Sequence, residues 1–82
     1  MSPKTPRNVS GSDLIKLLGK FGYEVVRQKG SHIRLSKLSG DSTHNITIPN
    51  HDPIKLGTLN AILSDVSDHL KITKDELINK LG

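Results

Sequence analysis

The segment from residue 23 to residue 49 constrains the fold most, because it alternates apolar with polar residues and contains two glycine turns. Successive side chains of a β-strand point to opposite faces of a sheet. If Ile33 and Leu35 point into a core, His32 and Arg34 therefore lie on the opposite face. The pattern predicts a sheet with one apolar face and one polar, cationic face.

Three strands account for this segment. Residues rich in β-forming side chains predict strands over 23–28, 31 to about 37, and 44–48. The Lys29-Gly30 pair predicts the first turn, and the turn-forming residues 38–43 predict the second. Both connections are short, so we expect all three strands to pair in antiparallel fashion.

The third strand repeats the alternation of the second. Ile46 and Ile48 are expected to share the core face with the apolar residues of the second strand. This leaves Asn45 and Thr47 on the face that carries His32. The polar face is thus expected to extend across both strands.

Two apolar stripes with helical spacing flank the strands. Ser10 is placed to cap the first helix, whose stripe runs over residues 14–21. The second stripe, over residues 59–70, predicts a helix that begins near Lys55 or at Gly57-Thr58.

A third, short helix is expected at the end of the chain, where residues 73–76 fit a capping box and apolar residues follow up to Leu81. The α-β-β-β-α order with this extra helix predicts a small two-layer α+β domain with helices on one face of the sheet. The other face stays open. We expect one domain over residues 9–82, preceded by a flexible N-terminal arm over residues 1–8.

Composition narrows the class of protein. With 82 residues, of which 33% are hydrophobic, the chain can bury only a thin core. It has no cysteine, which excludes disulfides and thiolate metal sites and fits a cytoplasmic protein. The sequence contains no long apolar run, so it predicts neither a signal segment nor a membrane span. The 12 lysines and arginines exceed the 8 acidic residues and give a formal net charge of +4, which suits a polyanionic partner.

The turn before the second strand is the main candidate for a binding site. Gly30 permits a backbone conformation that is closed to other residues, and N–H groups at such a turn can form an anion-binding concavity. Lys29, Ser31 and Arg34 add donors beside the imidazole of His32. A phosphate group is the ligand that this pattern favours.

Four motifs, in their order and spacing, resemble the HicA family of toxin ribonucleases. They are Val9-Ser10-Gly11, Gly22-Tyr23-Glu24-Val25-Val26-Arg27-Gln28-Lys29-Gly30-Ser31-His32, Pro49-Asn50-His51, and Gly57-Thr58-Leu59 ahead of Ile62-Leu63. The resemblance covers about residues 9–66. It implies a fold like the double-stranded-RNA-binding domain, ribonuclease activity on messenger RNA, and a cognate HicB antitoxin. It also implies a catalytic role for His32.

The chemistry of these residues is compatible with RNA cleavage without a metal or a cofactor. An imidazole has a pKa of about 6.5 and can take the proton from a ribose 2′-hydroxyl, whose oxygen then attacks the adjacent phosphorus. His32 is expected to be this general acid or base. Lys29, Arg34 and the Gly30-Ser31 turn are expected to bind the phosphate and stabilise its charge. His51 is a further candidate for substrate binding or proton transfer, because it follows the third strand.

Two other functions remain open. A non-catalytic RNA-binding module of the same element order would use phosphate and 2′-hydroxyl contacts, although the second helix begins with only one cation, Lys55. A protein-interaction domain would leave the cationic hairpin unexplained unless its partner is acidic. An antitoxin is expected to cover the catalytic site, so RNA and an acidic protein would use one surface. His44 and His69 are expected to be structural or solvent-facing, and the four histidines show no metal-ligand spacing.

Overall fold

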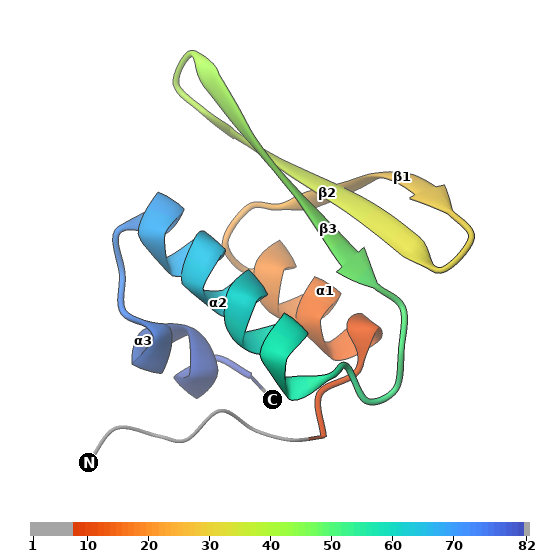
Figure 1. The fold of residues 1–82 in the computed structure, drawn as a ribbon. Coiled ribbons are helices and arrows are strands. Elements are labelled where there is room, and N and C mark those ends of the chain that lie inside the picture. The colour runs from red at the N-terminus through yellow and green to blue at the C-terminus, as the bar shows by residue number, and fades with distance from the viewer. Residues whose placement is uncertain (1–7, 82) are drawn as a thin grey trace.

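The computed structural model describes residues 8–81, which form three helices and three strands (Figure 1). They are α1 (Gly11–Gly19), β1 (Glu24–Lys29), β2 (His32–Ser39), β3 (Ser42–Pro49), α2 (Leu56–Leu70) and α3 (Lys74–Asn79). This order confirms the predicted α-β-β-β-α arrangement with a short C-terminal helix. The arm expected at residues 1–8 lies outside the described residues except for Asn8. None of the described helices is long and apolar enough to cross a membrane.

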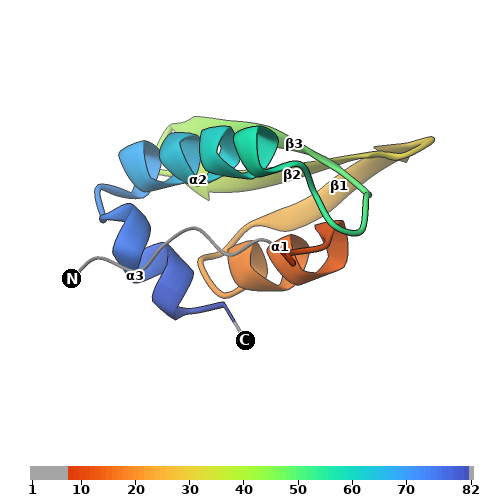
Figure 2. The same ribbon diagram turned by 60° about the horizontal axis from the view of Figure 1, so that its bottom comes forward.

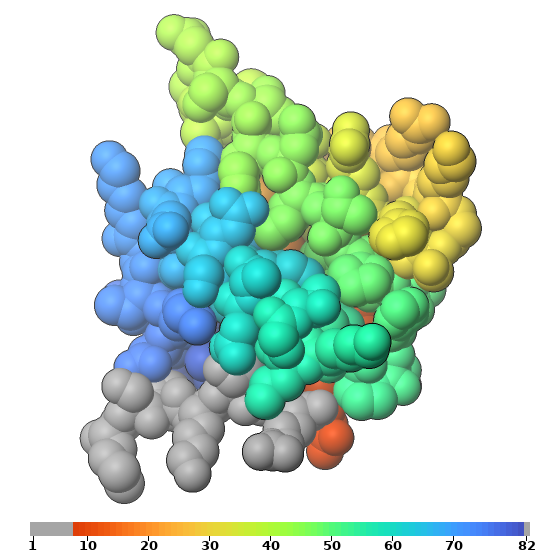
Figure 3. Space-filling model, viewed as in Figure 1, coloured from red at the N-terminus to blue at the C-terminus, as the bar shows by residue number. Residues whose placement is uncertain are grey.

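The three strands form one antiparallel sheet in the order β1-β2-β3. The helices α1 and α2 pack against one face of this sheet, and α3 packs against α2 (Figure 1 and Figure 2). The tip of the β2–β3 hairpin stands clear of the helices in the space-filling view (Figure 3). The opposite face of the sheet is left uncovered by the described helices, as the sequence predicts.

The core lies between the inner face of the sheet and the helices. The strand residues that are predicted to point inward are buried, namely Ile33, Leu35, Ile46 and Ile48. They pack with Val9, Leu14, Leu17, Leu18, Tyr23, Ile54, Leu59, Ile62, Leu63, Val66 and Leu77. His32, Arg34 and Thr47 alternate with these strand residues and are exposed, which confirms the predicted division between the two faces.

The first turn consists of Gly30 and Ser31, so its predicted placement at Lys29-Gly30 is wrong. Gly30 has a φ of +59°, the left-handed conformation that tight two-residue hairpin turns require. Lys29 is consequently the last residue of β1 and pairs with His32 across the hairpin. Its backbone is therefore fixed by the sheet.

The second turn is shorter than the predicted segment of residues 38–43. The strand β2 continues to Ser39 and β3 begins at Ser42, so only Gly40 and Asp41 connect them. The φ of Gly40 is +59°, which again closes a two-residue turn. The β2–β3 pairing continues here through polar residues. Because these residues lack the apolar alternation that predicts a strand, the sequence does not reveal that the strands extend this far.

Capping residues begin the helices as predicted. The Ser10 hydroxyl accepts a hydrogen bond from the Asp13 N–H at 3.1 Å, and the Asp13 carboxylate accepts one from the Ser10 N–H at 3.2 Å. Lys55 is the N-cap of α2, which confirms the start expected near this residue. The Thr73 hydroxyl caps α3 by accepting from the Glu76 N–H at 3.1 Å.

The loop after β3 joins the β1–β2 turn to α1. The Asn50 N–H donates to the Ser31 carbonyl at 2.6 Å, and the Gly11 N–H donates to the His51 carbonyl at 2.9 Å. A Cβ atom at Gly11 would lie 2.9 Å from both the Asn50 Cα and the Pro49 carbonyl oxygen, so a larger residue would force the backbone apart. This loop thereby fixes the start of β2 relative to α1.

A polar network fastens the β2–β3 hairpin to α2. The Tyr23 hydroxyl lies 2.6 Å from His44 Nδ1, and His44 Nε2 lies 3.2 Å from an Asp65 carboxylate oxygen. The rings of His44 and His69 stack with centroids 4.2 Å apart, and His69 Nε2 lies 3.2 Å from the Ser39 hydroxyl. The prediction that His44 and His69 are structural or solvent-facing is confirmed, and their role is structural.

Burial and, to a smaller extent, the negative charge of Asp65 raise the pKa of Tyr23 to about 12. Tyr23 therefore remains protonated at neutral pH, so its hydroxyl can donate a hydrogen bond to His44 Nδ1. The Nε2–H of His44 is then free to donate to Asp65. Because a carboxylate only accepts hydrogen bonds, whereas a phenolic hydroxyl can donate or accept one, the contact with Asp65 requires the proton on Nε2 of the imidazole.

We predict that Tyr23→Phe lowers the free energy of unfolding at pH 7 by about 1 kcal/mol, because it removes one largely buried hydrogen bond. The pKa of Tyr23 is raised in the folded state, from 10.0 to about 12, so its contribution is complete below pH 10 and disappears as the pH rises through this range. The stability difference between the two proteins should therefore narrow at about pH 11. Urea unfolding at pH 7 and pH 11 measures this difference, and an equal difference at the two pH values would contradict the raised pKa of Tyr23.

Candidate active site

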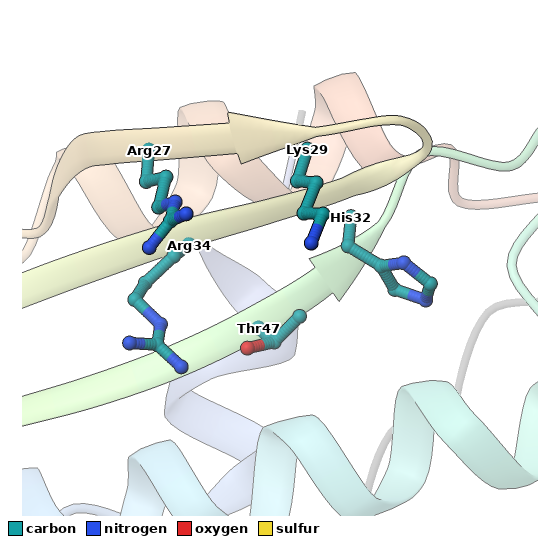
Figure 4. A pocket seen from close by; sticks show the side chains of 5 residues that line it. All are labelled: Arg27, Lys29, His32, Arg34 and Thr47. Atoms are coloured by element: carbon teal, nitrogen blue, oxygen red, sulfur yellow. The ribbon is translucent and has the colours of Figure 1, made fainter.

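An open hollow lies on the outer face of the sheet near the β1–β2 turn (Figure 4). It is lined by the exposed residues Arg27, Lys29, His32, Arg34 and Thr47. These residues come from all three strands. The structure thus brings Lys29, His32 and Arg34 together on one surface, as the sequence predicts.

The strand register arranges the hollow in two rows across the sheet. Lys29 faces His32, and we name this pair the histidine row. Arg27 faces Arg34, which faces Thr47 on its other side, and we name these three residues the arginine row. Figure 4 shows Arg27 and Lys29 extending from β1 over β2, while Arg34 extends over β3. The imidazole of His32 lies where β2 begins.

The cations of the hollow have no partner of opposite charge in the part of the chain that the structure describes. Within residues 8–81, the side chains of Arg27, Lys29 and Arg34 form neither a hydrogen bond nor a salt bridge. Like charges directly opposite each other across a sheet repel, and Arg27 and Arg34 are such a pair. An anion placed between them would relieve this repulsion and accept charge-assisted hydrogen bonds.

The imidazole of His32 is exposed and also has no hydrogen-bond partner in the described part of the chain. Its ring is therefore available to a ligand, whereas its backbone is held by the β1–β2 pairing. His44 and His69 belong to the separate network between the β2–β3 hairpin and α2. Among residues 8–81, no group of three or more His, Asp or Glu side chains is placed to hold a metal ion.

The remaining residues that the sequence assigns to the site lie beside the hollow. Gly30 and Ser31 form the turn between Lys29 and His32 and are not part of its lining. His51 is exposed in the loop after β3, and the structure does not bring its side chain into the lining either. Its backbone carbonyl has a structural role, because it accepts the hydrogen bond from α1.

Two residues of the hollow, Arg27 and Thr47, are not among those that the sequence assigns to the site. Alternation places Thr47 on this face, but a threonine has no distinctive chemistry that marks a site. Arg27 is found only from the hairpin register, because the two-residue turn after Lys29 sets it opposite Arg34. An arginine at this position also fits an ordinary solvated edge strand.

The sequence profile of the HicA toxins of bacterial toxin–antitoxin systems matches residues 11–67. The match covers α1, the whole sheet and most of α2, and it includes every residue that lines the hollow. The short helix α3 lies beyond it. Comparisons with curated proteins and with solved structures give no significant match.

Proposed function

Because this chain belongs to the HicA toxin family of bacterial toxin–antitoxin systems, we propose that it is an endoribonuclease that cleaves messenger RNA in the cytoplasm. The hollow carries this proposal, because it combines one imidazole with three cations that lack a carboxylate partner among the described residues. RNA offers a phosphate for the cations and a 2′-hydroxyl for the imidazole.

In the proposed reaction, His32 takes the proton of the 2′-hydroxyl. The freed oxygen bonds to the adjacent phosphorus while the bond to the 5′-oxygen of the next nucleotide breaks. The products are a 2′,3′-cyclic phosphate and a 5′-hydroxyl, whose proton comes from solvent in the open hollow. Lys29 and Arg34 stabilise the charge that develops on the phosphoryl oxygens, and the Gly30-Ser31 turn positions Lys29 beside His32. These steps require neither a metal ion nor a cofactor.

The site is expected to be a modest catalyst. A positioned acid or base contributes about 10²–10⁴-fold to a rate. His32 has no side-chain partner within residues 8–81 that would orient its ring, so the substrate must supply the contacts that align it. We propose that His51 contacts RNA that continues past the β1–β2 turn, because its loop is hydrogen-bonded to that turn.

The absence of a side chain that orients the His32 ring, within residues 8–81, also favours a second candidate function, a non-catalytic RNA-binding module. An exposed histidine among cations is sufficient to hold phosphates and 2′-hydroxyl groups without cleaving RNA. The two functions are distinguished by the fate of the RNA, which an endoribonuclease cleaves and a binding module leaves intact.

We predict that His32→Ala reduces RNA cleavage by at least about 100-fold, because it removes the only imidazole in the hollow. RNA binding should change by only a few-fold, since the cations remain. Cleavage of labelled RNA, filter binding and circular dichroism measure the three properties on the same preparations. Full cleavage by the folded variant would rule out the catalytic assignment, and intact RNA with the wild-type protein would favour the binding module.

A toxin of this family has a cognate antitoxin, and we propose that a HicB-like antitoxin covers the outer face of the sheet. Carboxylates of an acidic protein would compete with phosphates for the same guanidinium and ammonium donors. RNA and antitoxin would then exclude each other from the hollow. Inhibition would need no conformational change in the toxin.

We predict that Arg34→Ala weakens binding of both RNA and antitoxin at low salt. For RNA, the slope of log K against log salt concentration should fall by about 0.7, because one phosphate contact to a single strand is lost. The matched control is Lys16→Ala, which removes an exposed cation from α1. Titrations of the three proteins at several salt concentrations test the shared surface, and unchanged affinity of Arg34→Ala for both ligands would refute it.

A further inference from the structure

The charge of the outer sheet face changes over three successive rows. The histidine row and the arginine row are cationic and form the hollow. The next row contains Glu24, Ser36 and Asn45, and we name it the glutamate row. Its Ser36 hydroxyl donates a hydrogen bond to the amide oxygen of Asn45, so these two groups satisfy each other. The cationic surface is therefore two rows deep.

A β-bulge in β1 gives the glutamate row its negative charge. The register shifts between Val25 and Arg27, which makes Val26 an extra residue and brings Glu24 opposite Ser36. If the strands instead paired regularly, Val26 would lie opposite Leu35, and the alternation of faces would direct Glu24 to the inner side of the sheet. The bulge thus places a carboxylate directly beyond the arginine row, where it repels a phosphate.

The distance between the two cationic rows suits a nucleic-acid strand. His32 and Arg34 lie two residues apart on the same face of one strand, a separation of about 6.8 Å along the strand. Successive phosphorus atoms in a nucleic-acid strand are separated by a similar distance. An RNA strand that places one phosphate at the histidine row can therefore place the next phosphate at the arginine row.

We propose that the arginine row is a subsite for a second phosphate, adjacent in the RNA strand to the phosphate that reacts at the histidine row. This inference rests on the proposed function, which places the reacting phosphate at His32. Arg34 lies two residues from His32 on β2 and opposite Arg27, so its guanidinium is shared between the reacting phosphate and the second one. The substrate class is a single RNA strand with at least two consecutive phosphodiesters across the sheet. A third phosphate is disfavoured, because the glutamate row carries a carboxylate and its hydroxyl is already bonded to Asn45.

Arginine is suited to this task because its planar guanidinium presents paired donors to phosphate oxygens. Arg27 and Arg34 face each other without a carboxylate partner in the described residues, so a bound phosphate replaces repulsion with two charge-assisted contacts. The Thr47 hydroxyl, which lies in the same row, adds a neutral donor. RNA bases are expected to contribute little to binding here, because they would stack on aromatic side chains, and the only tyrosine is buried while the only phenylalanine packs against the core.

The test compares cleavage of three kinds of short oligonucleotide that share one cleavable bond next to a single ribose 2′-hydroxyl, all other sugars being deoxyribose. The first has one phosphodiester, the second has two, and the third has two linkages of which the non-reacting one is an uncharged methylphosphonate. Each longer oligonucleotide is made with its extra linkage on the 5′ side and on the 3′ side. The readout is the ratio of kcat/KM for the longer substrate to kcat/KM for the shortest.

For the wild-type protein at low salt, we expect the second phosphodiester to raise kcat/KM roughly tenfold on one side of the reacting bond, as one charge-assisted contact would. The methylphosphonate should give no gain. Arg27→Ala should reduce the ratio to about one, Arg27→Lys should restore part of it, and Lys16→Ala should keep the wild-type ratio. A ratio near one for the wild-type protein on both sides, or a full gain in Arg27→Ala, would overturn the subsite.

Failure of the proposed function gives a different result. If the wild-type protein leaves long RNA intact, the catalytic role of the histidine row is wrong, and the ratio of dissociation constants for the same oligonucleotides replaces the kinetic ratio. A second phosphate that strengthens binding in the wild-type protein but not in Arg27→Ala still supports the phosphate subsite. Equal affinity for the one-phosphate and two-phosphate oligonucleotides would overturn it.

Discussion

Burial of the inner sheet face under the helices determines where every functional side chain lies. A shift of one residue in the pairing of β2 would expose Ile33 and Leu35 and direct His32 and Arg34 into the core. Burial of an unpaired charge costs far more than the exposure of an aliphatic side chain. The hydrophobic effect therefore fixes the strand register, and the register in turn fixes the hollow on the outer face.

Backbone hydrogen bonds set the positions of the residues in the proposed site, since within residues 8–81 their side chains form no hydrogen bond or salt bridge with one another. The Gly30-Ser31 turn sets the histidine row, and the hydrogen bond from Asn50 to Ser31 anchors that turn to the loop that packs on Gly11. Motifs that are far apart in the sequence thus meet at one end of the sheet. Within residues 8–81 the cations of the hollow have no carboxylate partner, which is what the proposed binding of either RNA or an acidic antitoxin requires.

The sequence predicts much of this arrangement because period-two alternation carries direct information about faces. It correctly places His32, Arg34 and Thr47 together on the outer face of the sheet. It cannot identify Arg27 as part of the hollow, since that requires the hairpin register, and the assumed turn at Lys29-Gly30 was one residue early. The contact between His44 and α2 is equally invisible, because it joins side chains from elements that only tertiary packing brings together.

The most direct test of the central claim is the chemical nature of the ends that the protein leaves on RNA in excess EDTA. If the imidazole of His32 activates the 2′-hydroxyl, cleavage proceeds at an undiminished rate and leaves a 2′,3′-cyclic phosphate and a 5′-hydroxyl. Mass spectrometry of a cleaved oligonucleotide distinguishes these ends from others. A 3′-hydroxyl with a 5′-phosphate, or cleavage that stops with EDTA and returns with magnesium, would contradict the account.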